Sequence, residues 1–165
     1  MSGEVGLRRL RFANLHEKSN GVGGAIYLSP QSTLTAIDCT FEHGAARSGG
    51  AIYVDQATLT ISDSGFVSNS GPEGGGAIFS ISGTVTISSS SFTSNSVASI
   101  GHSGGNRNGG AIYATGALII SSTSFDSNSA ISDETCCAGK GQAVFYGQGY
   151  TNEEANAAFG VVAGR

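Results

Sequence analysis

Charged residues, proline and tryptophan are scarce in this sequence. Charged residues make up 12 % of the chain, against about 25 % for an average globular protein. With 39 % hydrophobic residues and a net charge of -4, the composition excludes a disordered chain. The acidic balance also lacks the clustered basic surface that nucleic-acid binding requires. We therefore expect a folded domain and no nucleic-acid partner.

Long apolar runs and regular cysteine spacings are missing as well. No apolar run approaches the roughly 18 residues of a transmembrane helix, and the N-terminus MSGEVGLRRLRF lacks the apolar centre of a signal peptide. Of the three cysteines, Cys136 and Cys137 are adjacent, and their spacing to Cys39 fits neither a disulfide framework nor a zinc site. We expect no transmembrane segment, no metal site and no cofactor.

What the sequence has in abundance is glycine, and the glycines mark a repeat. The tetrapeptide GGAI begins at Gly23, Gly49, Gly75 and Gly109, and a degenerate copy, GQAVF, begins at Gly141. Each full copy is followed by an alternating segment: TLTAI from Thr33, TLTIS from Thr58, TVTIS from Thr84 and ALIIS from Ala117. A phenylalanine comes next, at positions 41, 66, 92 and 125, and the last three copies continue as FxxN.

The repeat length and the alternation predict an all-β fold. In TLTIS, leucine and isoleucine share one face and the hydroxyl residues share the other, which is the period of a strand. Units of about 26 residues are too short for propeller blades. They fit the coils of a parallel β-helix, with three short strands per coil and about five coils. We expect one domain over residues 1–165, divided into an incomplete coil (1–22), full coils at 23–48, 49–74, 75–108 and 109–140, and a last coil with a cap (141–165).

Equivalent residues of stacked coils should form columns. We predict four inward columns: Ile26, Ile52, Ile78, Ile112 and Val144; Leu34, Leu59, Val85 and Leu118; Ile37, Ile61, Ile87 and Ile120; and Phe41, Phe66, Phe92 and Phe125. A ladder of buried amides is predicted for Asn69, Asn95 and Asn128. The residues after the GGAI isoleucine should form an aromatic column whose stacked rings stabilise the sheet: Tyr27, Tyr53, Phe79 and Tyr113, with Phe145 after them. The column faces outward if the isoleucines point inward, and belongs to the core if they do not. An outward column also allows binding of sugar rings or a protein.

The paired GGAI and FxxN repeats resemble those of chlamydial polymorphic membrane proteins and similar surface β-helix proteins. The resemblance covers residues Leu10 to Phe145. It implies a right-handed parallel β-helix at the cell surface or outside the cell, acting as a non-catalytic adhesin that binds glycans or proteins of a host or neighbouring cell. It also implies that this chain is a piece of a longer solenoid.

A carbohydrate-active enzyme, either a polysaccharide lyase or a glycoside hydrolase, is the alternative. Asp38 and Asp63 both lie three residues before a phenylalanine and should be neighbours on adjacent coils, and paired carboxylates are the machinery of glycosidases. The same position holds Ser89 and Ser122 in later coils, so two solvated acids are the simpler interpretation. We expect no activity.

Other patterns carry weaker hypotheses. Threonines at 33, 58 and 84, beside those at 35, 60 and 86, form a short outward T-x-T array, which allows ice binding as a minor alternative to plain strand propensity. His16, His43 and His102 occupy unrelated repeat positions, and Cys39 fills a slot for small residues. Binding specificity is expected from the inserted segments Val97–Asn108 and Ala130–Lys140. NEEANAAF could form a capping helix, since an uncapped stack would permit end-to-end or edge self-association.

Overall fold

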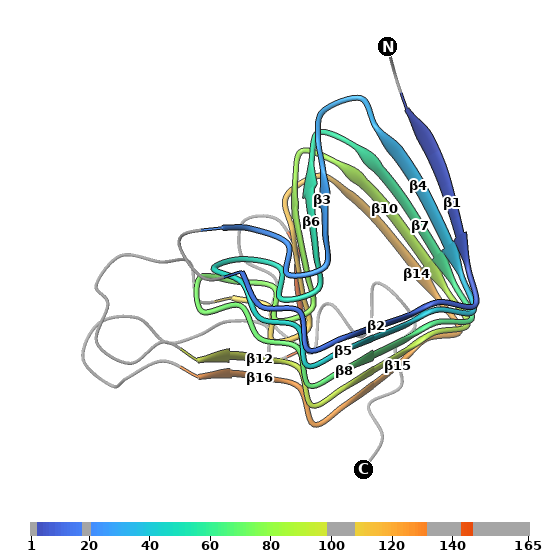
Figure 1. Cartoon of the computed structure of the whole chain (residues 1–165). Helices are drawn as coiled ribbons and strands as arrows, with labels where there is room; N and C mark the ends of the chain where they lie inside the picture. The colour runs from blue at the N-terminus through green and yellow to red at the C-terminus, as the bar shows by residue number, and fades with distance from the viewer. Residues whose placement is uncertain (1–2, 18–20, 99–107, 132–142, 147–165) are drawn as a thin grey trace.

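The computed structural model describes residues 3–17, 21–98, 108–131 and 143–146, and this part of the chain is a stack of parallel β-coils (Figure 1). Three five-stranded sheets run the length of the stack, and every named strand pair is parallel. The described residues contain no helix. The predicted all-β solenoid is therefore confirmed.

Each main sheet takes its strands from successive coils. The first sheet contains β1 (Glu4–Arg8), β4 (Thr33–Ile37), β7 (Thr58–Ser62), β10 (Thr84–Ser88) and β14 (Ala117–Ser121). The second sheet contains β2 (Arg11–Ala13), β5 (Thr40–Glu42), β8 (Gly65–Val67), β11 (Ser91–Thr93) and β15 (Ser124–Asp126). The third sheet contains β3 (Ile26–Leu28), β6 (Ile52–Asp55), β9 (Ile78–Ile81), β13 (Ile112–Ala114) and β17 (Val144–Tyr146). A small fourth sheet pairs β12 (Ser96–Ala98) with β16 (Ser129–Ile131).

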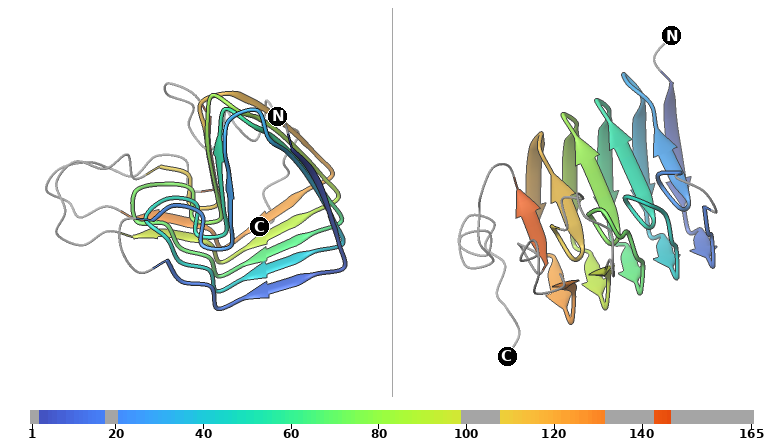
Figure 2. Two further views of the ribbon diagram at one scale, coloured as in Figure 1. Left: turned by 45° about the horizontal axis from the view of Figure 1, so that its top comes forward. Right: turned by 90° about the vertical axis from the view of Figure 1, so that its left-hand side faces the viewer.

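Each coil adds one strand to each of the three main sheets. Viewed from the N-terminal end, the chain runs clockwise from the first sheet to the second and then to the third while it recedes (Figures 1 and 2). This is the right-handed crossover that parallel strands of one sheet prefer. The described chain makes about 4 turns, which is close to the predicted five coils.

The interior is filled by columns of equivalent apolar side chains. The predicted GGAI column is buried at Ile52, Ile78 and Ile112, and the phenylalanine column stacks with ring centroids 4.6–5.0 Å apart. The phenylalanine column also includes Phe12 of the first coil, which stacks on Phe41.

One predicted column is wrong at its first member, Ile37. Ala36 pairs with Ile61 and is fully buried, whereas Ile37 pairs with Ser62 on the outer face. Alternation from the buried Leu34 fixes this outcome, because the inward side chains of a strand are two residues apart.

Single residues in the left-handed region make the corners of each coil. Between the first and second sheets these residues are Arg9, Asp38, Asp63, Ser89 and Ser122, with φ between 47° and 55°. After the second sheet they are Asn14, His43, Ser68, Ser94 and Ser127, with φ between 53° and 56°. Short polar residues tolerate this conformation better than β-branched ones. Eight of these ten corner residues are accordingly Asp, Asn or Ser, and the other two are Arg9 and His43.

The glycine pair of each GGAI motif makes a corner of a different kind. The first glycine has a φ of 63° at Gly49 and 56° at Gly75. The second glycine packs against the backbone of the next coil: a Cβ at Gly50 would lie 2.3 Å from the carbonyl oxygen of Gly76 and 2.5 Å from the backbone of Ser70. The first position thus requires glycine for its conformation, and the second requires it for close approach.

The three asparagines of the FxxN motifs lie in a buried column beside this corner. Asn69 Nδ2 donates to Asn95 Oδ1 over 2.9 Å, and Asn95 Nδ2 donates to Asn128 Oδ1 over 2.9 Å. Each amide nitrogen also donates to the carbonyl oxygen of a phenylalanine in the preceding coil, such as Phe41 for Asn69. The ladder ends at Gly44, whose N–H donates to Asn69 Oδ1. These bonds satisfy polar groups that would otherwise be costly to bury.

Replacing Gly50 by alanine should lower the free energy of unfolding by about 3 kcal/mol, because the new Cβ has only backbone atoms of Gly76 and Ser70 around it. The matched control is Gly65→Ala, where the nearest atom to a Cβ is Ser91 Oγ at 3.6 Å, and the change should be within about 0.5 kcal/mol. Urea unfolding followed by circular dichroism measures both values. Equal stability of the two variants would contradict the close-approach role of the second glycine.

Candidate functional site

The aromatic residues that follow each GGAI isoleucine form one stacked column on the outer side of the third sheet. Neighbouring ring centroids are 4.5–5.6 Å apart along the series Tyr27, Tyr53, Phe79, Tyr113 and Phe145. The rings make a cluster separate from the main core, to which the GGAI isoleucines belong. Strand alternation explains the separation, since adjacent residues point to opposite faces.

Exposure of this column decreases along the stack. Tyr27 is 50 % exposed and Tyr53 is partly buried, whereas Phe79 and Tyr113 are only 9 % and 7 % exposed. Of the four residues that the sequence suggested for binding, Tyr27 and Tyr53 therefore offer accessible surface. Phe79 and Tyr113 lie too deep to present their rings to a ligand. Both residues lie in the aromatic stack, as predicted. Their burial could not be predicted, because they follow the same GGAI motif as the exposed Tyr27.

The Tyr27 hydroxyl is hydrogen-bonded to an acid of the next coil, Asp55. Tyr27 Oη donates to Asp55 Oδ2 over 3.2 Å, and Gln56 Nε2 donates to Asp55 Oδ1 over 3.4 Å. Burial raises the pKa of Tyr27, and the hydrogen bond and negative charge of Asp55 raise it further. Burial also raises the pKa of Tyr53, with smaller contributions from Asp55 and Tyr27. The result is a pair of protonated phenols beside a carboxylate and an amide.

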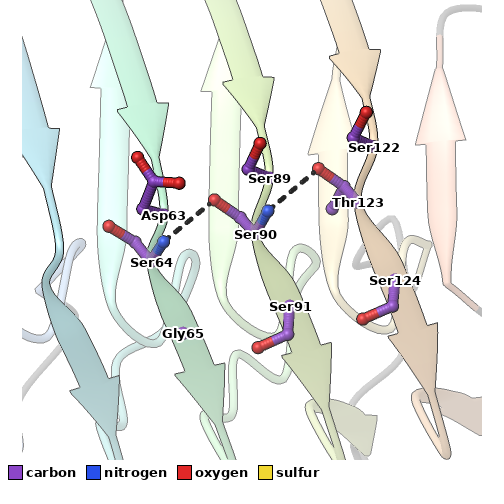
Figure 3. Close-up of a pocket in the computed structure, with 9 residues that line it drawn as sticks. All are labelled: Asp63, Ser64, Gly65, Ser89, Ser90, Ser91, Ser122, Thr123 and Ser124. Atoms are coloured by element: carbon purple, nitrogen blue, oxygen red, sulfur yellow. Dashed lines mark hydrogen bonds between the residues drawn. The ribbon is translucent and has the colours of Figure 1, made fainter.

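An open groove runs along the corner between the first and second sheets (Figure 3). It has a volume of about 790 Å³, and its lining comes from three consecutive coils: Asp63, Ser64, Gly65, Ser89, Ser90, Ser91, Ser122, Thr123 and Ser124. Asp63 is the charged member of this lining, and the other side chains are hydroxyls. The groove can therefore donate and accept hydrogen bonds without a strong charge.

Hydroxyl groups at the base of the groove form a second ladder. Ser64 N–H donates to Ser90 Oγ over 3.1 Å, and Ser90 N–H donates to Thr123 Oγ1 over 3.4 Å (Figure 3). Ser64 Oγ and Ser90 Oγ each donate in turn to a carbonyl two residues earlier, over 2.7 Å. Cys39 occupies the same slot and its N–H donates to Ser64 Oγ. The sequence identified this slot as one for small residues, but the ladder itself was missed. Its signal was a serine, threonine or cysteine directly after the corner residue in four successive coils, at Cys39, Ser64, Ser90 and Thr123.

Asp38 and Asp63, the acids of the enzyme alternative, occupy equivalent corners of adjacent coils. The N–H of Asp38 donates to the carbonyl of Ser62, the residue before Asp63. Both aspartates are exposed and have positive φ, and Asp38 forms an ion pair with Arg9, with Nε and Oδ2 3.6 Å apart. The corner conformation accounts for aspartate at both positions. The geometry gives them a structural role and supplies no observation that favours catalysis.

The threonine array lies on the outer face of the first sheet. Thr33, Thr58 and Thr84 are paired in register, as are Thr35, Thr60 and Thr86. In the next coil the two columns continue as Ala117 and Ile119, and Ile119 is 57 % exposed. The regular hydroxyl pattern thus spans three coils and ends at an exposed apolar side chain.

The remaining sequence predictions concern a metal site, a membrane-spanning segment, and residues that lie mostly outside the described part of the chain. Within residues 3–17, 21–98, 108–131 and 143–146, no three His, Cys, Asp or Glu side chains come together as a metal site. The same ranges contain no helix that could span a membrane. His102, Cys136, Cys137 and NEEANAAF lie outside the described residues, as do most of the two inserted segments. The described starts of these segments are β12 and β16, which pair beside the outer side of the third sheet (Figure 1).

Comparison with known proteins links the repeat to a family. Residues 89–115 match the family model described as the Chlamydia polymorphic membrane protein repeat. This stretch includes an FxxN motif and the following GGAI motif. No curated protein and no solved structure matches the chain. The matched repeat and the parallel β-solenoid confirm the resemblance that the sequence predicted, and both fit a β-helix of the surface-protein type.

The raised pKa values of Tyr27 and Tyr53 predict how this site responds to alkaline pH. An ordinary tyrosine ionises near pH 10, so the stability that the two neutral phenols contribute is complete below about pH 10 and is lost as the pH rises through their folded-state pKa values. Replacing Asp55 by asparagine removes a negative charge and should lower both pKa values.

Tyrosinate absorbance, titrated against pH in the folded protein, measures this shift. Asp126→Asn is the matched control, because Asp126 lies in β15 of the second sheet, away from the tyrosine column. Identical titration curves for the wild type and Asp55→Asn would show that Asp55 has no influence on the tyrosines.

Proposed function

We propose that this chain is a rigid, non-catalytic β-helical module of a cell-surface protein, and that it binds glycans of a host or neighbouring cell. The repeat at residues 89–115 and the solenoid fold support the surface-protein part of the proposal. The binding part is supported by the exposed end of the aromatic column. A protein ligand on the same scaffold is the second form of this hypothesis.

The observation that carries the proposal is the arrangement of Tyr27, Tyr53, Asp55 and Gln56. Aromatic rings offer apolar surface for the C–H groups of a sugar. The Asp55 carboxylate accepts hydrogen bonds from Tyr27 and from the Gln56 amide, and these groups provide acceptors and a donor for sugar hydroxyls. Sites of this kind combine mostly apolar contact with a few fixed polar groups. Because the rings are stacked on one another, little conformational entropy is lost when a ligand binds.

The scaffold suits presentation of such a surface. Backbone bonds between coils and the buried ladders fix the position of each outer side chain relative to its neighbours. The inserted segments begin at β12 and β16, which lie beside the outer side of the third sheet (Figure 1). The aromatic rings form their cluster on that outer side. In this proposal they extend the binding surface beyond the tyrosines.

Binding of the purified chain to a glycan array, followed by calorimetry on any glycan it retains, tests the proposal. Tyr27→Ala should weaken the interaction at least about tenfold, because a central aromatic contact is lost. Ile119→Ala is the matched control: it also removes an exposed apolar side chain, but from the outer face of the first sheet, and it should leave binding unchanged.

Two results would contradict the proposal. One is the absence of binding to any glycan or cell-surface protein, or binding that Tyr27→Ala leaves intact. The other is cleavage of a pectin-like or alginate-like polysaccharide that is abolished when Asp38 and Asp63 are both replaced by alanine. The second result would establish the enzyme alternative.

A further inference from the structure

The outer face of the first sheet carries no charge over four successive coils. Strands β4, β7, β10 and β14 each turn three side chains outward, and all of these are threonine, serine, isoleucine or alanine. Strands β4, β7 and β10 lie inside the sheet and are paired on both sides. Their outward side chains therefore form a continuous surface away from any sheet edge.

The threonines of this surface form a regular array of two columns, which we call the threonine face. The columns are paired in register, Thr33 with Thr58 and Thr84, and Thr35 with Thr60 and Thr86. Neighbouring strands of a sheet are about 4.8 Å apart, and alternate residues of one strand are about 6.6 Å apart. The threonine face is thus a rectangular lattice of side chains whose spacing the backbone fixes.

Strand propensity alone does not account for this uniformity. Threonine is favoured on exposed strand faces in general, and the second sheet is built from the same coils. Its outward positions nevertheless hold arginine, glutamate, aspartate, glycine, alanine, valine and serine as well as threonine. The threonine columns are therefore a specific property of the first sheet.

The hydroxyl groups of the threonine face have no partner in the described part of the protein, where none of them donates or accepts a hydrogen bond. The hydroxyls of Ser64 and Ser90 in the corner ladder, by contrast, donate to carbonyls. A threonine hydroxyl has one donor and two acceptor lone pairs, and its branched side chain adopts few rotamers. The face therefore offers hydrogen-bonding groups to water at regular positions.

We propose that the threonine face binds ice. Oxygen atoms on the prism faces of hexagonal ice repeat in two perpendicular directions, at distances similar to those between neighbouring threonines of the face. The unpaired hydroxyls supply bonds to that lattice at matching intervals. The absence of charge complements a surface that carries none, because a charged side chain would hold a hydration shell of its own. This activity is independent of glycan binding, since it uses a different sheet.

Slow growth of ice in a solution of the purified full chain, followed by measurement of the protein in the ice and in the liquid, tests this proposal. The wild type should be enriched in the ice. Thr60→Lys places a charge at the centre of one column and should exclude the chain from the ice. The matched control is Thr93→Lys, the same change at an outward position of the second sheet, and it should remain enriched.

Both lysine variants should keep the circular dichroism spectrum and the glycan binding of the wild type, because each replaces an outward side chain far from the tyrosine column.

A gain-of-function variant tests the columns without disrupting them. The double substitution of Ala117→Thr and Ile119→Thr continues both columns into β14, where these residues are in register with Thr84 and Thr86. It should raise the ratio of protein in the ice to protein in the liquid at least about twofold, because the added contacts act together with the existing ones.

Three outcomes would overturn the proposal. The first is exclusion of the wild type from ice, and the second is enrichment that Thr60→Lys leaves intact. The third is a double variant that is no more enriched than the wild type, which would show that the threonine columns are only a consequence of strand propensity. None of these outcomes depends on whether the chain binds a glycan.

Discussion

Stacking of each coil on the next, in register, is the constraint on which the rest of this structure depends. The strands are only three to five residues long, too short to be stable without neighbours on the stack. Backbone bonds between coils continue through the corners, as at Gly50 to Gly76 and Asp38 to Ser62. Equivalent positions of successive coils therefore lie directly against one another, and the same residue type packs against itself from coil to coil. This is why phenylalanine, asparagine and paired glycine recur at fixed positions.

The same constraint separates the interior from the outer surface. Inside, Phe66, Ile78 and Asn95 each meet an equivalent residue above and below, so a change in one coil disturbs its neighbours. Outside, the coils tolerate variation: the corner column changes from Asp63 to Ser89 and Ser122 with nearly the same φ. Asp55, which pairs with Ile81 in the next coil, is such a variation, and in the function proposed above it adds a charged group beside Tyr27. A local site of this kind is thus expected where the repeat is imperfect.

Most of the fold could be predicted from the sequence. The repeat length determines which residues stack in successive coils, and the alternation of apolar and polar residues determines which side chains point inward. The prediction for Ile37 failed because it matched Ile37 to the isoleucines of the other coils by residue type. Strand alternation places Ala36, the neighbour of Ile37, in register with Ile61 and inside the coil. The hydroxyl ladder at Ser64 and Ser90 was missed because serine is common on exposed strands and its hydrogen bonds depend on corner geometry. The burial of Phe79 and Tyr113 could not be predicted either, since tertiary surroundings rather than the local pattern determine it.

Hydrogen exchange of side-chain amides tests in-register stacking most directly. If the coils are stacked in register, the Nδ2 protons of Asn69 and Asn95, which are buried and hydrogen-bonded, will exchange only when the stack opens. The exposed Asn14 provides the reference within the same molecule. We expect strong protection of Asn69 and Asn95 and rapid exchange of Asn14, as measured by nuclear magnetic resonance. Exchange of Asn69 and Asn95 at the rate of Asn14 would contradict a stack held together in this way.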